Sequence, residues 1–270
     1  ELMKTTGARV HLCRLSSAAG IALVREAKAQ GLPVTCDVSI NSLHLTDTDI
    51  GYFDARLRLS PPVRQQRDRD ALREALADGT LDALVSNHTP VDNDAKTLPF
   101  AEAEPGATGL ELLLSLALKW GQESGAGLPR ALGVVTCEPA RVLGGALGTL
   151  QASCGQLVEG GVADVVVFDP QAHWQVEAGG LRSQGKHTPF SSYELPGRVR
   201  CTLVSGQVAF STIPRIQDFP LLPQPLAWYL GRRAQQLNRI THQILSSPLH
   251  GPSTLGSPVS PGPLARWKAV

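Results

Sequence analysis

The chain has 270 residues, of which 42% are hydrophobic and 18% charged, and its formal net charge is +1, as expected for a soluble globular protein of one or two domains. A charge so near zero gives no electrostatic basis for binding nucleic acid or an anionic membrane surface, so we expect neither partner. No apolar run reaches the roughly 18 residues that a membrane span needs, and the five cysteines form no CxxC pair, which predicts a reduced, cytoplasmic protein.

Apolar runs alternate with amphipathic ones in the first third of the chain. The alternation predicts, in order, a strand over residues 9–15, a helix over 17–31, a strand over 32–38, a helix over 65–80 and a strand over 81–86. This order is typical of parallel α/β units, in which active groups gather at the carboxyl ends of the strands. Asn87 and His88 directly follow the third strand, so they lie at such an end.

The second half of the chain changes character. Helices are expected over residues 108–123, 128–135 and 138–143, and glycine-punctuated β runs over about 155–210 predict a small β module. Beyond residue 211 the chain becomes rich in proline, and its Pro/Gly/Ser end is expected to be disordered.

Seven segments, in this order and spacing, resemble the dihydroorotases of the amidohydrolase superfamily over residues 10–210. They are HLCRLSSAAGIALVREAKAQGLPVT, LSPPVR, GTLDALVSNHTP, PFAEAEPGATGLELLLSLAL, CEPARVLG, GQLVEGGVADVVVFDP and GKHTPFSSYELPGRVRCTLVSGQVAF.

The resemblance implies an α/β fold, the C-terminal half of a (β/α)₈ amidohydrolase barrel with a small β-sandwich module. Residues 1–150 would supply strands 5–8 of the barrel and its final helices, residues 151–211 the β-sandwich module, and residues 212–270 a proline-rich tail of unknown origin. Because the chain opens on Glu1 and matches from about the fifth strand, we expect an N-terminally truncated sequence. The first-strand HxH pair and the fourth-strand carboxylated lysine, which hold the family's two zinc ions, then have no counterpart here.

The remaining site positions of the family are substituted in this chain. Arg14 stands where the resemblance implies a histidine ligand, Ser42 replaces a second histidine ligand, and Asn87 replaces the aspartate that serves as ligand and base. Val91 and Ser60 replace a histidine and an asparagine that contact substrate. Arginine has no lone pair to give to zinc, and a neutral amide cannot act as a general base, so we expect no zinc and no catalytic residue at these positions.

Ordinary structural roles are expected for the other polar residues of this region. We predict that His88 is a hydrogen-bonded remnant and that Arg14 replaces the lost positive charge of the metal and holds the emptied pocket together. A structural role is expected, rather than a metal-ligand role, for three histidines: His11, His44 and His88. A solvated loop, rather than a catalytic pair, is expected for Asp92 and Asp94. Turn or helix-start roles are expected for Glu104, Gly106 and Gly109.

The resemblance therefore implies two alternative functions. The first is a catalytically inactive dihydroorotase-like subunit that assembles with aspartate carbamoyltransferase, as a hetero-oligomer, in de novo pyrimidine biosynthesis. The second is an active zinc-dependent cyclic amidohydrolase that interconverts dihydroorotate and N-carbamoyl-aspartate, with its missing ligands on an upstream segment.

Overall fold

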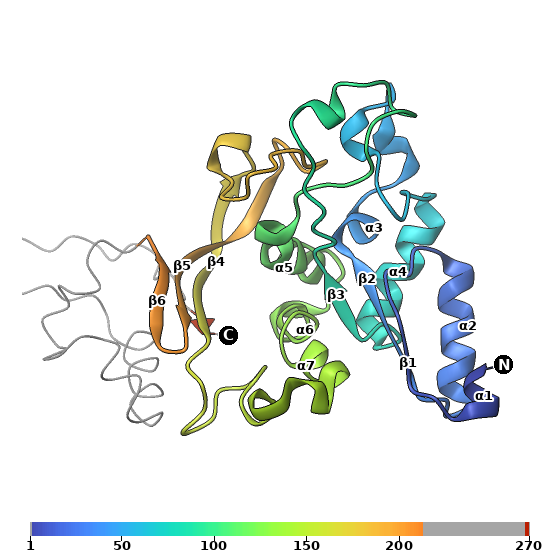
Figure 1. Cartoon of the computed structure of the whole chain (residues 1–270), viewed down its shortest axis with the longest axis vertical. Helices are drawn as coiled ribbons and strands as arrows, with labels where there is room; N and C mark the ends of the chain where they lie inside the picture. The colour runs from blue at the N-terminus through green and yellow to red at the C-terminus, as the bar shows by residue number, and fades with distance from the viewer. Residues whose placement is uncertain (1, 213–267, 270) are drawn as a thin grey trace, which may run out of the picture. The chain divides into compact units, whose positions relative to one another are not determined.

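The structure is a computed structural model that describes residues 2–212 and 268–269 (Figure 1). The chain divides into two compact units, one formed by Glu1–Gly144 with Trp174–Pro196 and the other by Gly145–His173 with Gly197–Val270. The segment Trp174–Pro196 falls inside the expected β module but groups with the first unit. The domain boundaries at residues 150 and 211 stay a prediction.

A three-stranded parallel sheet forms the centre of the first unit. Its strands are β1 (Val10–Leu12), β2 (Val34–Ser39) and β3 (Ala83–Val85), in the order β1-β2-β3. The register pairs His11 with Thr35 and Asp37 with Ala83. The parallel α/β arrangement predicted from the alternation of runs is confirmed, and the three carboxyl ends lie at one edge of the sheet.

Seven α-helices are present among the described residues, all in the first unit. They are α1 (Leu2–Thr6), α2 (Ala18–Ala29), α3 (Ile40–His44), α4 (Gln66–Asp78), α5 (Leu113–Glu123), α6 (Gly127–Gly133) and α7 (Cys137–Leu143). Figure 1 shows α2 and α4, which contact each other, beside the strands. Over residues 2–212 and 268–269, no helix has both the length and the apolar character that crossing a bilayer requires.

Local sequence signals set the ends of the helices that connect the strands. Ser17 caps α2, because its side chain accepts a hydrogen bond from the backbone N–H of Gly20, and α4 ends at Gly79 in the left-handed conformation. The short helix α3 was not predicted. It follows β2 without a connecting loop, and Ser39 caps it by accepting from the backbone N–H of Ser42.

The core of the first unit gathers apolar side chains from the sheet and the helices on it. Ile21 and Val24 of α2, Leu72 and Leu76 of α4, and Trp120 of α5 are each at most 2% exposed. These positions recur at three- and four-residue spacing along each helix, so burying them fixes which face of each helix meets the sheet.

The antiparallel strands lie mostly in the second unit. They are β4 (Val165–Gln175), β5 (Glu194–Val204), β6 (Gln207–Ser211) and β7 (Lys268–Ala269), in the order β6-β5-β4-β7. Strands β5 and β6 form a hairpin around Ser205 and Gly206, both of which have positive φ. Apart from residues 212, 268 and 269, the predicted proline-rich tail lies outside the described residues.

Candidate functional site

The carboxyl ends of the three parallel strands place the predicted site residues at one edge of the sheet. Arg14 follows β1 by two residues, Ser42 lies in α3 directly after β2, and Asn87 follows β3 by two residues. Ser60 belongs to the connection between α3 and α4. Positions 14 and 87 are far apart in the sequence, but they lie at the same edge of the sheet because the strands are parallel.

Arg14, Asn87 and Ser60 are joined by hydrogen bonds. The Arg14 guanidinium donates to Asn87 Oδ1 over 3.1 Å and to the Ser60 carbonyl oxygen over 3.4 Å. Asn87 Nδ2 donates to the same carbonyl over 3.1 Å. Arg14 and Asn87 have φ values of 55° and 47°, which non-glycine residues rarely adopt. The two strained positions flank the central strand β2, and their side chains meet each other.

Ser42 takes part in a different set of contacts. Its hydroxyl oxygen accepts from Ser39 Oγ over 3.1 Å, and its backbone N–H donates to the same Ser39 oxygen. Both residues are buried, Ser39 fully and Ser42 with 6% exposure. The described hydrogen bonds of Ser42 therefore stabilise the start of α3 and do not reach Arg14 or Asn87.

The residues at the family's zinc positions do not fit a binuclear zinc centre. Arg14 offers five N–H donors and no lone pair, and its permanent positive charge repels a dication. The Asn87 oxygen already accepts from Arg14, and a neutral amide is a weaker zinc ligand than a carboxylate. A serine hydroxyl such as that of Ser42 is not among the common protein ligands of zinc.

His88 makes backbone contacts that explain its place without any ligand role. Its Nδ1 accepts from the backbone N–H of Gly109 over 3.2 Å and from that of Leu110 over 3.3 Å. Nδ1 is therefore unprotonated, and the proton of the neutral ring lies on Nε2. The imidazole holds the loop before α5 against the end of β3.

Close packing also surrounds the loop that contains Val91. Val91 is half-buried, and a Cβ atom added at Gly106 would lie 3.1 Å from its Cγ1 atom and 2.5 Å from the Thr89 carbonyl oxygen. A Cβ atom at Gly109 would lie 2.5 Å from the Ser86 carbonyl oxygen. The two glycines thus let neighbouring backbones approach closely, which agrees with the turn and helix-start roles expected for them.

The polar residues of the next loop make hydrogen bonds mainly through their backbone carbonyl oxygens. Asp92, Asn93 and Asp94 are exposed, and the carbonyl oxygens of Asp92 and Asp94 accept from backbone N–H groups three residues further on. His187 Nε2 lies 3.0 Å from the Asn93 carbonyl oxygen. Glu104 is exposed and offers its carbonyl oxygen to Lys96. This pattern is that of a solvated turn.

Two basic groups in this unit, the half-buried His44 and the buried Lys96, have lowered pKa values. Burial, together with the positive charge of Arg73, lowers the pKa of His44 from 6.5 to about 3, and its Nε2 lies 3.0 Å from the Leu116 carbonyl oxygen. Burial, with the charge of Arg58, lowers the pKa of Lys96 to about 8. Lys96 donates to the carbonyl oxygens of Arg58 and Glu104, so it ties two loops together. No pattern in the sequence pointed to Lys96.

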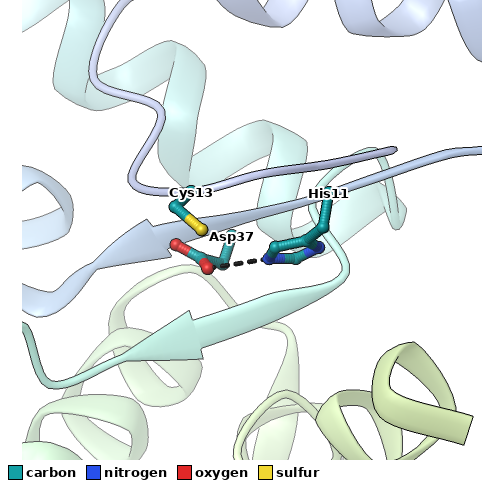
Figure 2. Close-up of side chains that lie close together, drawn as sticks. All are labelled: His11, Cys13 and Asp37. Carbon is teal, nitrogen blue, oxygen red and sulfur yellow. Dashed lines mark hydrogen bonds and ion pairs between the residues drawn. The ribbon is translucent and has the colours of Figure 1, made fainter. Parts of the chain in front are cut away.

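A cluster of three potential metal ligands was missed by the sequence reasoning. His11, Cys13 and Asp37 bring one nitrogen, one sulfur and one oxygen atom within 4.8 Å of one another (Figure 2). It is the one group of three or more such residues found in the part of the chain that the structure describes. The available signal was HxC on one predicted strand and TxD on the next, which share a face when the strands are parallel.

The curated proteins that this chain resembles are dihydroorotases and dihydroorotase-like proteins. No family model matches the chain. A dihydroorotase-like protein of Pseudomonas aeruginosa is 43% identical over 207 residues, which are 77% of this chain and 47% of that protein. A dihydroorotase of a Geobacter species is 38% identical over 77% of this chain and 48% of that protein. The chain thus spans about half the length of the curated relatives that it matches.

Solved structures agree on the fold. The dihydropyrimidinase of Brevibacillus agri matches 78% of this chain and 46% of its own, with a TM-score of 0.70 at 22% identity. The L-hydantoinase of Arthrobacter aurescens matches 78% of this chain and 46% of its own, with a TM-score of 0.70 at 28% identity. The predicted fold class, part of an amidohydrolase barrel with a small β module, is confirmed.

Proposed function

The matched 77% of this chain belongs to the dihydroorotase family, and from that premise we propose that the protein is a catalytically inactive member with a structural role. Its partner in this proposal is aspartate carbamoyltransferase, the preceding enzyme of pyrimidine synthesis, with which it forms a hetero-oligomer. The proposed location is the cytoplasm, with which the five free cysteines agree.

The hydrogen bond between Arg14 and Asn87 is the observation that supports inactivity best. In the family these positions provide a histidine ligand and an aspartate that is both ligand and base. Here a permanent cation donates to a neutral amide over 3.1 Å, so neither a lone pair for a metal nor a base for a proton is offered. The contact joins the segments that follow β1 and β3.

The names of the relatives agree with this proposal. Relatives from Pseudomonas aeruginosa and Pseudomonas putida, both named dihydroorotase-like protein, share 43% and 41% identity with this chain. Relatives named dihydroorotase from Geobacter and Anaeromyxobacter share 38% and 39%. The name dihydroorotase-like protein thus belongs to the two of these relatives with the slightly higher identity.

Co-expression with the transferase chain of the same organism tests the structural role. We expect one assembly in size-exclusion chromatography with light scattering, and weaker assembly of the transferase when this protein is left out. A variant carrying Arg14→His, Ser42→His and Asn87→Asp is the matched control and should associate equally well, because the proposal places assembly apart from these positions. Two independent peaks at micromolar concentration, with unchanged transferase activity, would contradict the proposal.

The alternative is an active zinc-dependent cyclic amidohydrolase, which the relatives named dihydroorotase favour. It requires ligands from a segment outside these 270 residues. An assay of dihydroorotate hydrolysis on the protein expressed from its complete gene separates the two. Turnover that is abolished by a chelator and restored by zinc would establish the alternative, whereas the inactive assignment expects no turnover at any zinc concentration.

A further inference from the structure

We propose that His11, Cys13 and Asp37 form a binding site for a single zinc-class divalent cation, separate from the family positions at Arg14, Ser42 and Asn87. The cluster does not depend on the proposed function, because it is built from residues that the family's zinc positions do not include. Figure 2 shows the three side chains pointing toward one another from β1, the segment after it, and β2.

The pairing of β1 with β2 creates the cluster. His11 stands directly beside Thr35 in the parallel register, and Leu12 beside Cys36. Alternate residues of a strand point to the same face, so His11 shares a face with Cys13, and Thr35 with Asp37. The four side chains therefore meet on one face of two neighbouring strands.

The donor set suits zinc and its spectroscopic substitute cobalt. Histidine nitrogen, cysteine thiolate and aspartate oxygen are the three kinds of ligand that zinc takes in proteins, and three protein ligands leave a fourth position for water. The His11 side chain is 29% exposed, Cys13 is exposed, and the Asp37 side chain is 8% exposed. The site thus has a buried carboxylate at its base and an open side through which an ion can enter.

The distances require only a small adjustment. The ligand atoms lie within 4.8 Å of one another, and His11 Nε2 lies 2.9 Å from Asp37 Oδ2. Around a tetrahedral zinc ion with bonds of about 2.0–2.3 Å, ligand atoms are separated by roughly 3.3–3.8 Å. The His11–Asp37 pair must therefore open by a few tenths of an ångström, and a pair near the 4.8 Å limit must close by about 1 Å.

Neighbouring groups already orient two of the three ligands. His11 Nδ1 lies 2.8 Å from Thr35 Oγ1, and the backbone N–H of Arg14 donates to Asp37 Oδ1 over 2.7 Å. A metal-binding histidine commonly donates its other ring N–H to such a partner, which fixes the tautomer and the direction of the lone pair. In the ion-bound state, an Nδ1–H group that donates to Thr35 would leave the lone pair of Nε2 available for the ion.

Binding of the ion exchanges protons in a defined way. The contact between His11 Nε2 and Asp37 Oδ2 is a hydrogen bond through one proton, and a bound ion would take the place of that proton. In the neutral ring this proton moves through solvent from Nε2 to Nδ1, where it donates to Thr35 Oγ1, so His11 releases no net proton. The Cys13 thiol loses its proton to solvent and binds as thiolate. Without an ion, the same contacts are a plain histidine–aspartate pair, so the experiment must separate these two states.

Titration of the full 270-residue chain with Co²⁺, followed by displacement with Zn²⁺, distinguishes an ion-binding site from a histidine–aspartate pair that binds no ion. We expect one ion per chain and a thiolate-to-cobalt charge-transfer band, which only a bound cysteine sulfur produces. Cys13→Ser should abolish the band and weaken cobalt binding at least ten-fold. Cys154→Ser, at another exposed cysteine, is the matched control and should leave both unchanged.

A second variant probes the orienting partner of His11. Thr35→Val keeps the shape of the side chain but removes its hydroxyl, and loss of such a partner is expected to weaken metal binding by about 10–100-fold. Thermal melts in the absence of metal check that each variant folds, and exposure of Cys13 makes Cys13→Ser the safest of them. Absence of the charge-transfer band in the wild-type chain, or equal cobalt binding by Cys13→Ser, would overturn the proposal.

Discussion

The guanidinium group of Arg14 donates a hydrogen bond to Asn87 Oδ1 over 3.1 Å, although the two residues are 73 positions apart in the sequence. Both have positive φ values and follow strands that flank β2. A cation paired with a neutral amide at this place is not a ligand set that a zinc ion takes.

A double-mutant cycle measures the contact between Arg14 and Asn87. Because both residues are partly exposed, we expect a coupling free energy of about 0.5–1 kcal/mol between Arg14→Gln and Asn87→Ala in chemical denaturation. Asn87→Ala adds backbone strain at its positive φ, but the strain occurs in both arms of the cycle and cancels. A coupling of zero would mean that the two side chains do not interact in solution.

His88 is expected to act as a hydrogen-bond acceptor for the backbone. His88→Leu leaves the N–H groups of Gly109 and Leu110 without that acceptor and should destabilise the protein by about 1–3 kcal/mol. His88→Asn can present its side-chain oxygen near the place of Nδ1 and should cost less. Urea denaturation gives both values, and equal destabilisation by the two variants would show that the ring itself, rather than its acceptor, matters.

Gly109 is expected to tolerate no side chain. In Gly109→Ala the new Cβ atom would lie 2.5 Å from the Ser86 carbonyl oxygen and 3.0 Å from Ile40 Cδ1, so the variant should lose about 1–3 kcal/mol of stability. Gly179→Ala is the control, since no atom lies within 4 Å of its added Cβ. Comparable melting temperatures for the two variants would contradict the close approach at Gly109.

His44 should make the protein less stable as the pH falls. Burial lowers its pKa from 6.5 to about 3, so below pH 6.5 the unfolded chain binds a proton that the folded chain refuses until about pH 3. The unfolded state binds more protons in this window, so stability decreases as the pH drops through it. His44→Gln, which keeps an N–H donor for the Leu116 carbonyl oxygen, should flatten the dependence.

The measurement is the free energy of unfolding of the wild-type chain and of His44→Gln between pH 7 and about pH 5, above the range in which carboxylates titrate. The wild type should lose stability across this range and the variant should lose less. Parallel curves for the two proteins would show that the His44 ring is accessible to protons in the folded state.

The sequence by itself determined most of the first unit's secondary structure, namely β1–β3, α2 and α4–α7, and the chemistry of its substitutions. Hydrophobic periodicity and the caps at Ser17 and Gly79 are local signals, so the strands and helices around them could be predicted from neighbouring residues alone. The inability of Arg14 to bind zinc and of Asn87 to act as a base follows from their side-chain chemistry. The short helix α3 was not predicted from the sequence, because it has only five residues.

Tertiary structure decided which of these residues meet. The contact of Arg14 with Asn87, the backbone groups held by His88, and the cluster of His11, Cys13 and Asp37 all depend on how strands distant in the sequence are paired. A shift of one residue in the register of β1 against β2 would turn the facing side chains to opposite sides of the sheet. That register is fixed by burial of the whole core, which no local stretch of sequence contains.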